Sequence, residues 1–127
     1  MEIIPNWHPI FVHFTVSLFS TAVLFYLMSY LGNYLTWVSK SIINELEIAG
    51  RWCLWTVAMI TVGTILAGLY AYYTVQHDEI SHVMMTNHRN WALPTALCIL
   101  LVAIWSLWSY IMQKPINIIF VSILLIT

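Results

Sequence analysis

The fold is decided by the run IFVHFTVSLFSTAVLFYLMSYL, which occupies residues Ile10–Leu31. The run contains no Lys, Arg, Asp or Glu. It is longer than the roughly 20 apolar residues that cross a hydrocarbon core about 30 Å thick. Pro9 directly precedes it and suits the first turn of a helix, where the backbone needs no N–H donor. The run therefore predicts a helix that spans a membrane.

The composition indicates the same environment for the whole chain. Its 127 residues are 61% hydrophobic and 7% charged, whereas soluble domains carry about 25% charged residues. This number of charged residues is too small for a surface that faces water, so lipid is the expected solvent. A formal net charge of -1 gives no sign of a basic patch for nucleic acid. Cys53 and Cys98 lie in separate apolar runs without metal-ligand spacing, so we expect two buried, small apolar side chains.

Three more apolar runs complete the expected architecture. Trp52–Tyr73 and Trp91–Met112 are as long as the first run. The last run, Ile116–Thr127, makes only about 18 Å of helix, so we expect it to be short or truncated. The prediction is one all-α domain, residues 1–127, that forms a polytopic membrane helical bundle with four transmembrane helices. These helices are expected at about residues 10–31, 52–73, 91–112 and 116–127.

Small residues mark one face of the second expected helix. Gly63, Ala67 and Ala71 stand one turn apart, with Gly68 beside them. Small residues at this spacing let two helix backbones approach closely in lipid. We therefore expect this face to pack against another helix.

The segment Gly32–Arg51 is expected to be a solvated connection that leads into the second helix. It carries Lys40, Glu45 and Glu47, which lipid does not accommodate. The alternative is a helix lying partly on the membrane surface, because several apolar residues recur at helical spacing. These residues are Ile42, Ile43, Leu46 and Ala49.

The histidines gather in two segments that border apolar runs. One is NWHPIFVHF, residues Asn6–Phe14, and the other is HDEISHVMMTNHRNW, residues His77–Trp91. Because consecutive spans alternate in direction, both segments fall on the same side of the membrane. The histidines that share this side are His8, His13, His77, His82 and His88.

The cations predict which side this is. Lys40, Arg51 and Lys114 lie on the side opposite the histidines, and Arg89 lies among them. Cytoplasmic loops collect Lys and Arg. We therefore expect a multi-pass protein of the bacterial inner membrane, with its N-terminus and histidines on the periplasmic, outer side.

Histidines facing one another between helices favour a bound metal or haem. Imidazole ligates haem iron, copper and zinc alike. A b-type haem requires two imidazoles from facing elements. His13 lies about one turn inside the apolar run and is expected to pair with a histidine of the second segment. His8 and His13 point about 140° apart on a helix, so they do not grip one ion together. Arg89 is expected to pair with a haem propionate, and Trp91 to line the haem slot.

Two alternatives to haem remain at this site: a copper ion, or no ligand at all. Copper would accept the histidines together with Met84 or Met85. Zinc is less favoured, because no carboxylate base stands beside three ligands. Asp78 and Glu79 are suited to orient an imidazole by accepting its second N–H. In the alternative without a ligand, all five histidines are polar residues at a membrane–water interface and bind nothing.

The motifs resemble a bacterial membrane family catalogued as domain of unknown function 2231. HPIFVHF, residues His8–Phe14, resembles the opening of its first helix. The stretch Ala71–Leu93 resembles the segment between its second and third helices. The resemblance implies a four-helix membrane protein, often found near c-type cytochromes or other redox components, with a further tail after helix four that is absent beyond Thr127. The positions that carry over are His8, His13, His77, His82 and His88.

Two functions from different classes follow from these observations. The leading hypothesis is a small redox protein that binds b-type haem, or less favourably copper, and exchanges electrons with a quinone or a periplasmic cytochrome within a larger membrane complex. The alternative is a non-catalytic accessory subunit without a cofactor, docked through the small-residue face. A transporter ranks lower, because no charged residue lies near the expected bilayer midplane. A stand-alone enzyme is disfavoured, since the chain offers no nucleophile–base pair, phosphate loop or dinucleotide fingerprint.

Overall fold

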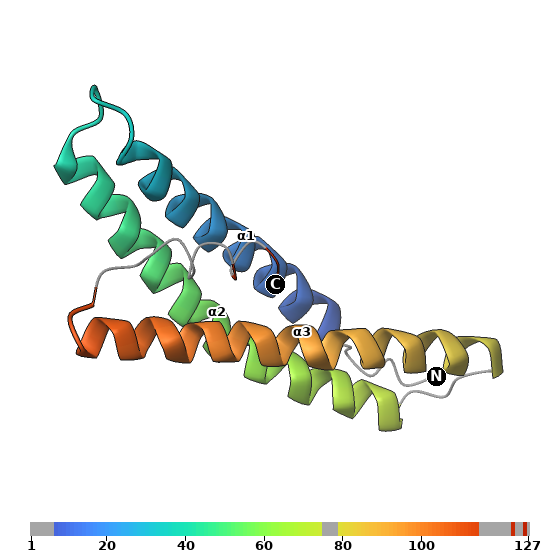
Figure 1. The fold of residues 1–127 in the computed structure, drawn as a ribbon. Coiled ribbons are helices and arrows are strands. Elements are labelled where there is room, and N and C mark those ends of the chain that lie inside the picture. Colours follow the sequence, from blue (N-terminus) through green and yellow to red (C-terminus); the bar gives the residue numbers. More distant parts are fainter. Residues whose placement is uncertain (1–6, 75–78, 115–122, 124–125, 127) are drawn as a thin grey trace.

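The computed structural model describes residues 7–74, 79–114, 123 and 126, with the backbone alone for residues 79–82. It contains three long helices in the order α1 (His8–Gly32), α2 (Lys40–Thr74) and α3 (Glu79–Ile111) (Figure 1). The described residues contain no strand. The all-α prediction is therefore confirmed. The predicted fourth helix falls almost entirely outside the described residues and stays a prediction.

Each of these helices is long and apolar enough to cross a bilayer. The spans His8–Gly32, Lys40–Thr74 and Val83–Ile111 have a mean hydropathy of 1.8 or 1.9. The 25 residues of α1 rise about 37 Å, which exceeds the hydrocarbon thickness of about 30 Å. The prediction of a multi-pass membrane protein is confirmed at this level.

The second helix begins much earlier than expected. α2 has 35 residues and starts at Lys40 rather than near residue 52. Most of the segment expected to be a solvated connection is therefore helical. The reason is that α1 covers its inner face: Ile43 is buried under Gly32, and Ser29 Oγ donates a hydrogen bond of 3.1 Å to Glu47 Oε1.

α1 and α2 run antiparallel and side by side along most of α1 (Figure 1). Glycines of α2 form the contact. A Cβ atom added at Gly50 would lie 3.3 Å from Phe25 Cβ, which is tighter than ordinary van der Waals contact. At Gly63 the nearest atom would be in the ring of Phe11, at 3.7 Å. The expected close packing of the small-residue face is confirmed, and its partner is α1.

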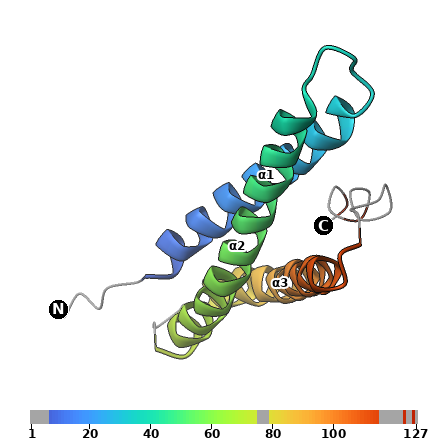
Figure 2. The same cartoon turned by 90° about the vertical axis from the view of Figure 1, so that its left-hand side faces the viewer.

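α3 crosses this pair obliquely rather than lying parallel to it (Figures 1 and 2). The three helices meet in the C-terminal half of α3, where Tyr26 OH and Ser106 Oγ share a hydrogen bond of 3.4 Å. The buried apolar cluster at this crossing comprises Ala22, Tyr26, Leu54, Val57, Ile99, Val102 and Ala103. α3 thus contacts the α1–α2 pair over a short stretch.

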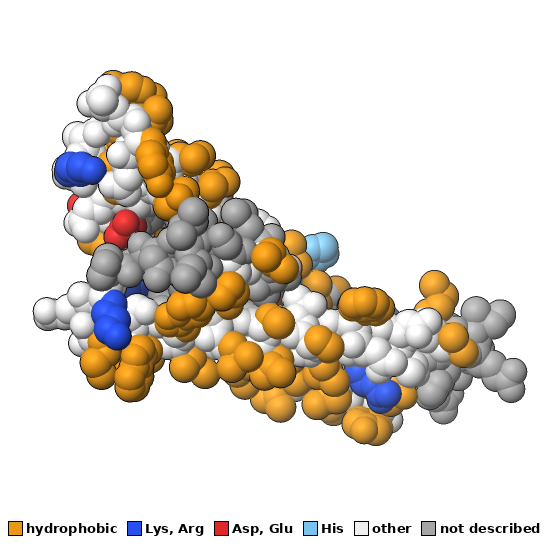
Figure 3. All heavy atoms as spheres, in the orientation of Figure 1, with side chains coloured by type: hydrophobic (Ala, Val, Ile, Leu, Met, Phe, Trp, Pro, Cys, Tyr) orange, Lys and Arg blue, Asp and Glu red, His pale blue; other side chains and the backbone are white. Residues whose placement is uncertain are grey.

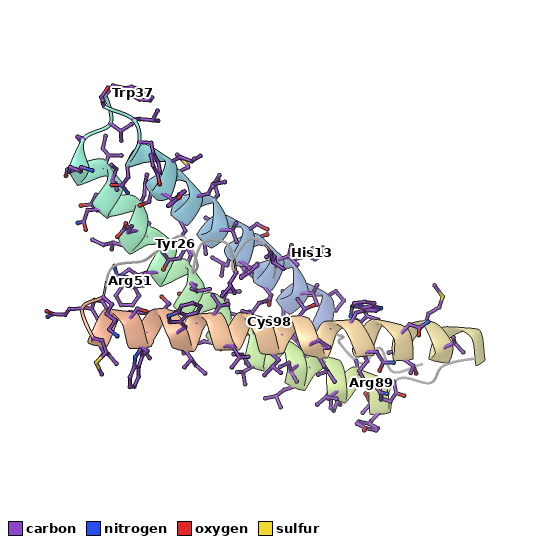
Figure 4. The ribbon with its side chains drawn as sticks, viewed as in Figure 1. His13, Tyr26, Trp37, Arg51, Arg89 and Cys98 are labelled. Carbon is purple, nitrogen blue, oxygen red and sulfur yellow. The ribbon has the colours of Figure 1, made fainter. Side chains whose placement is uncertain are left out.

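The outer surface of the helices is apolar. Figure 3 shows hydrophobic side chains along the length of α3, with few charged groups between them. Met59 is 79% exposed, as expected for a side chain that faces lipid. Cys98 is also exposed, so the prediction that it is buried is wrong; it projects from α3 like the apolar residues around it (Figure 4).

The close α1–α2 contact generates a prediction about stability. Replacing Gly50 with Val should destabilise the protein by about 1–3 kcal/mol, because the added methyl groups would force Phe25 and Tyr26 away. Thr56→Val is the matched control: it places the same side chain on the exposed face of α2 and should change stability by less than about 0.5 kcal/mol. Thermal unfolding in detergent measures both. Equal stability of the two variants would contradict the tight contact.

Candidate functional site

A cavity of about 750 Å³ lies between the three helices at the histidine end. The start of α1, the second half of α2 and the first half of α3 each contribute to its wall. Most of the surface that lines it is apolar, and threonines, histidines and one arginine supply most of its polar groups. The lining residues are His8, Val12, Thr15, Val16, Thr61, Thr64, Ile65, Gly68, Leu69, Ala71, Tyr72, Met84, Met85, His88, Arg89, Trp91, Ala92, Leu93, Thr95, Ala96 and Ile99.

His8 is held at one side of the cavity by two contacts with α2. Its ring lies directly on Gly68, where an added Cβ would come within 2.8 Å of His8 Cε1. Its Nδ1 lies 3.2 Å from the backbone oxygen of Thr64. Because a carbonyl oxygen only accepts, Nδ1 must donate. The neutral ring then carries its lone pair on Nε2, which is the arrangement usual for a ligating histidine whose other nitrogen is oriented by a backbone carbonyl.

A pair of threonines supports the same wall. Thr15 Oγ1 and Thr64 Oγ1 share a hydrogen bond of 2.9 Å between α1 and α2. One of the two hydroxyls donates to the other, and the accepting hydroxyl donates to a carbonyl of its own helix: Phe11 O from Thr15 at 2.9 Å, or Ile60 O from Thr64 at 3.0 Å. These bonds join α1 to α2 at Thr64, whose carbonyl orients His8. The position of the His8 ring therefore follows from the α1–α2 contact.

His88 faces His8 from α3. The two ring centroids are 6.1 Å apart and the ring planes are inclined at 77°. One turn of helix separates His88 from Met84, which also lines the cavity. The imidazoles of two different helices therefore border one apolar space.

Arg89 and Trp91 stand beside this pair. The guanidinium carbon of Arg89 lies 4.9 Å from the centre of the Tyr72 ring, a cation–π distance that places the charge near the end of α2 (Figure 4). Trp91 lines the cavity and is 79% exposed. A cation and an amphipathic ring thus lie on the α3 side of the opening.

The geometry can be compared with the needs of a metal ion and of haem. The imidazole centroids are 6.1 Å apart, a spacing at which two rings could share one metal ion at metal–nitrogen distances of about 2 Å. Among the described residues, no group of three or more His, Cys, Asp or Glu side chains is placed to hold a metal ion. Two imidazoles over an apolar cavity are what a haem needs from the protein, because the porphyrin supplies the other ligands.

The predicted site residues divide into three groups. His8, His88, Arg89 and Trp91 all line the cavity. His13 does not: it is exposed on α1 and points away from α3 (Figure 4). His8 is therefore the histidine of α1 that faces His88, and a ligand role for His13 stays a prediction. His77 lies outside the described residues, as does the side chain of His82 on α3, so their predicted roles also stay predictions.

Sequence reasoning missed the part of the site that α2 supplies. Thr64 orients His8, Gly68 supports its ring, and Tyr72 receives Arg89. A signal was present: these three residues recur every four positions and so share one helix face. Only Gly68 drew attention, and it was interpreted as a packing residue.

A scan of protein-family models found no match to this chain, and neither the curated proteins nor the solved structures contain one that matches it. The resemblance to domain of unknown function 2231 therefore stays a prediction.

The contact of His8 with Gly68 generates a prediction. In Gly68→Ala the new methyl group would overlap His8 Cε1, so the ring should leave Thr64 and become more reactive. The measurement is the rate at which diethyl pyrocarbonate modifies His8, resolved by mass spectrometry of the peptides. We expect a rise of several-fold. Gly63→Ala, whose methyl group has ordinary contact distances, should leave the rate unchanged; equal rates in both variants would show that Gly68 does not hold the ring.

Proposed function

We propose that this protein is a small electron-transfer protein of the bacterial cell membrane that holds b-type haem between His8 and His88. The observation that carries the proposal is the pair of imidazoles from α1 and α3, whose centroids are 6.1 Å apart beside an apolar cavity of about 750 Å³. In helical bundles, cofactor sites are built in this way from side chains on facing helices.

Haem fits this arrangement better than a bare copper ion. Copper would need Met84 or Met85 in addition to the two imidazoles; Met84 is 69% exposed, and Met85 is half-buried in the lining. A copper ion would occupy only a small part of the cavity volume of about 750 Å³. His8 and His88 would hold the haem iron, and the apolar lining of the cavity would pack against the macrocycle.

Each residue of the site has a role in this proposal. The Thr64 carbonyl orients His8 so that Nε2 carries the lone pair. Arg89, stacked on Tyr72, is placed to pair with a propionate. When bound, haem b supplies a one-electron iron couple, and the apolar lining limits access of water to it, which tunes its reduction potential.

The partners follow from the position of the site. Three of the four cations of the chain, Lys40, Arg51 and Lys114, lie toward the opposite end, and the positive-inside rule makes this an argument for histidines on the periplasmic side. A haem on this side of the membrane would exchange single electrons with a quinone in the bilayer or with a periplasmic cytochrome. The protein would act within a larger membrane redox complex.

The test is a reduced-minus-oxidised absorption spectrum of the protein in detergent, with metal analysis of the same sample. We expect sharp haem bands in the parent protein. His8→Ala and His88→Ala should each lower haem affinity by at least about tenfold, since even groups that only orient a ligand are worth that much. His13→Ala is the matched control and should keep the bands.

A variant whose missing imidazole can be supplied from the buffer distinguishes loss of the iron-binding side chain from loss of the fold. In His88→Gly, imidazole added to the buffer should restore the spectrum, because it can fill the space left by the side chain. A colourless parent protein with stoichiometric copper would replace haem with copper. A colourless protein without metal would overturn the proposal and favour the accessory subunit, whose partner would have to bind elsewhere than the small-residue face that α1 covers.

A further inference from the structure

A second, smaller cavity lies at the opposite end of the molecule. Its volume is about 360 Å³, and it is formed by the first half of α2 and the end of α3. Its charged side chains are Arg51, Lys114 and Glu47. Two cations and one carboxylate leave one net positive charge. The haem proposal uses none of these groups.

Arg51 is held in this cavity by an aromatic residue. Its guanidinium carbon lies 4.7 Å from the centre of the Tyr110 ring, a cation–π distance. A guanidinium has five N–H donors, so stacking on the ring leaves donors that can point into the cavity. Figure 4 shows Arg51 beside the C-terminal end of α3, far along that helix from Arg89.

Lys114 is placed by the way α3 ends. The N–H of Lys114 donates to Ser109 O at 2.9 Å, and the N–H of Gln113 donates to Tyr110 O at 3.1 Å. These two bonds form a Schellman motif, which requires a left-handed residue. Gln113 takes that role with a φ of 52°, although glycine would do so with less strain. The motif turns the chain back over the helix end and brings Lys114 to the cavity.

The rest of the lining offers hydrogen-bonding groups rather than apolar ones. Ser106 is 3% exposed and Ser109 is 9% exposed, so both lie toward the floor. Glu47 is held to one side by its hydrogen bond from Ser29. An anion between Arg51 and Lys114 would therefore meet two cations and serine hydroxyls, together with the single carboxylate of Glu47.

We propose that this cavity binds the phosphodiester headgroup of a membrane phospholipid, with preference for an anionic one. The charged residues of α2 and α3 mark the end of the apolar spans here, which is the level of the lipid phosphates. Basic pockets between transmembrane helices are known to bind such headgroups. The acyl chains would lie along the exposed apolar side of α3, where Trp108 and Ile111 project. The net positive charge matches one phosphodiester.

The experiment is a titration of the detergent-purified protein with dioctanoyl phosphatidylglycerol. The rise in melting temperature with lipid concentration measures the binding affinity. Arg51→Gln and Lys114→Gln should each weaken binding about fivefold, the usual effect of one cation near lipid headgroups. Glu47→Gln should strengthen binding, because it removes the opposing charge while its amide oxygen can still accept from Ser29. This gain distinguishes the site from a general loss of folding.

Three controls decide the outcome. Lys40→Gln removes a cation from the same side of the membrane, but Lys40 bonds Asn33 rather than lining the cavity, so lipid affinity should not change. Dioctanoyl phosphatidylcholine should bind more weakly than phosphatidylglycerol. Inorganic phosphate should bind far more weakly than either lipid. If Arg51→Gln and Lys40→Gln have the same affinity, the cavity does not hold the headgroup; if inorganic phosphate binds as tightly as phosphatidylglycerol, its ligand is a soluble phosphate.

Discussion

The contact between α1 and the glycine face of α2 is the interaction on which the rest of the structure depends. In lipid the hydrophobic effect does not drive helices together, so close van der Waals packing must do so. Gly50 and Gly68 permit that approach, and they also set the register of the two helices. The same register brings His8 to Thr64 at one end and Ser29 to Glu47 at the other. The register of α1 against α2 thus positions the polar groups at both ends of the pair.

The oblique path of α3 explains why there is a cavity at each end. α3 meets the pair at its middle through Ile99, Val102 and Ala103. Before this crossing, His88 and Arg89 line the larger cavity, and after it Ser109 and Lys114 line the smaller one. A parallel third helix would have filled both spaces with side chains. The described fold therefore separates an apolar, histidine-bordered space from a polar, cationic one.

The general architecture was predictable from the sequence, and the details of both sites were not. Long uncharged runs require spanning helices, since only a helix satisfies its own backbone in lipid. The start of α2 was missed because Glu47 and Arg51 suggested a solvated loop, whereas Ser29 of α1 donates a hydrogen bond to Glu47 and the Tyr110 ring of α3 stacks against Arg51. His8 could not be preferred over His13 by local pattern, because Gly68 and Thr64, which hold its ring, lie on another helix.

The register of α2 also has a consequence for the bilayer itself. From Arg51 to Gly68, which supports His8, α2 rises about 26 Å, whereas a hydrocarbon core is about 30 Å thick. The two polar levels therefore bracket slightly less than one bilayer core. Tilting would shorten the bracketed distance further. The register of α1 and α2, more than the length of either helix, therefore sets how far apart the polar groups lie across the bilayer.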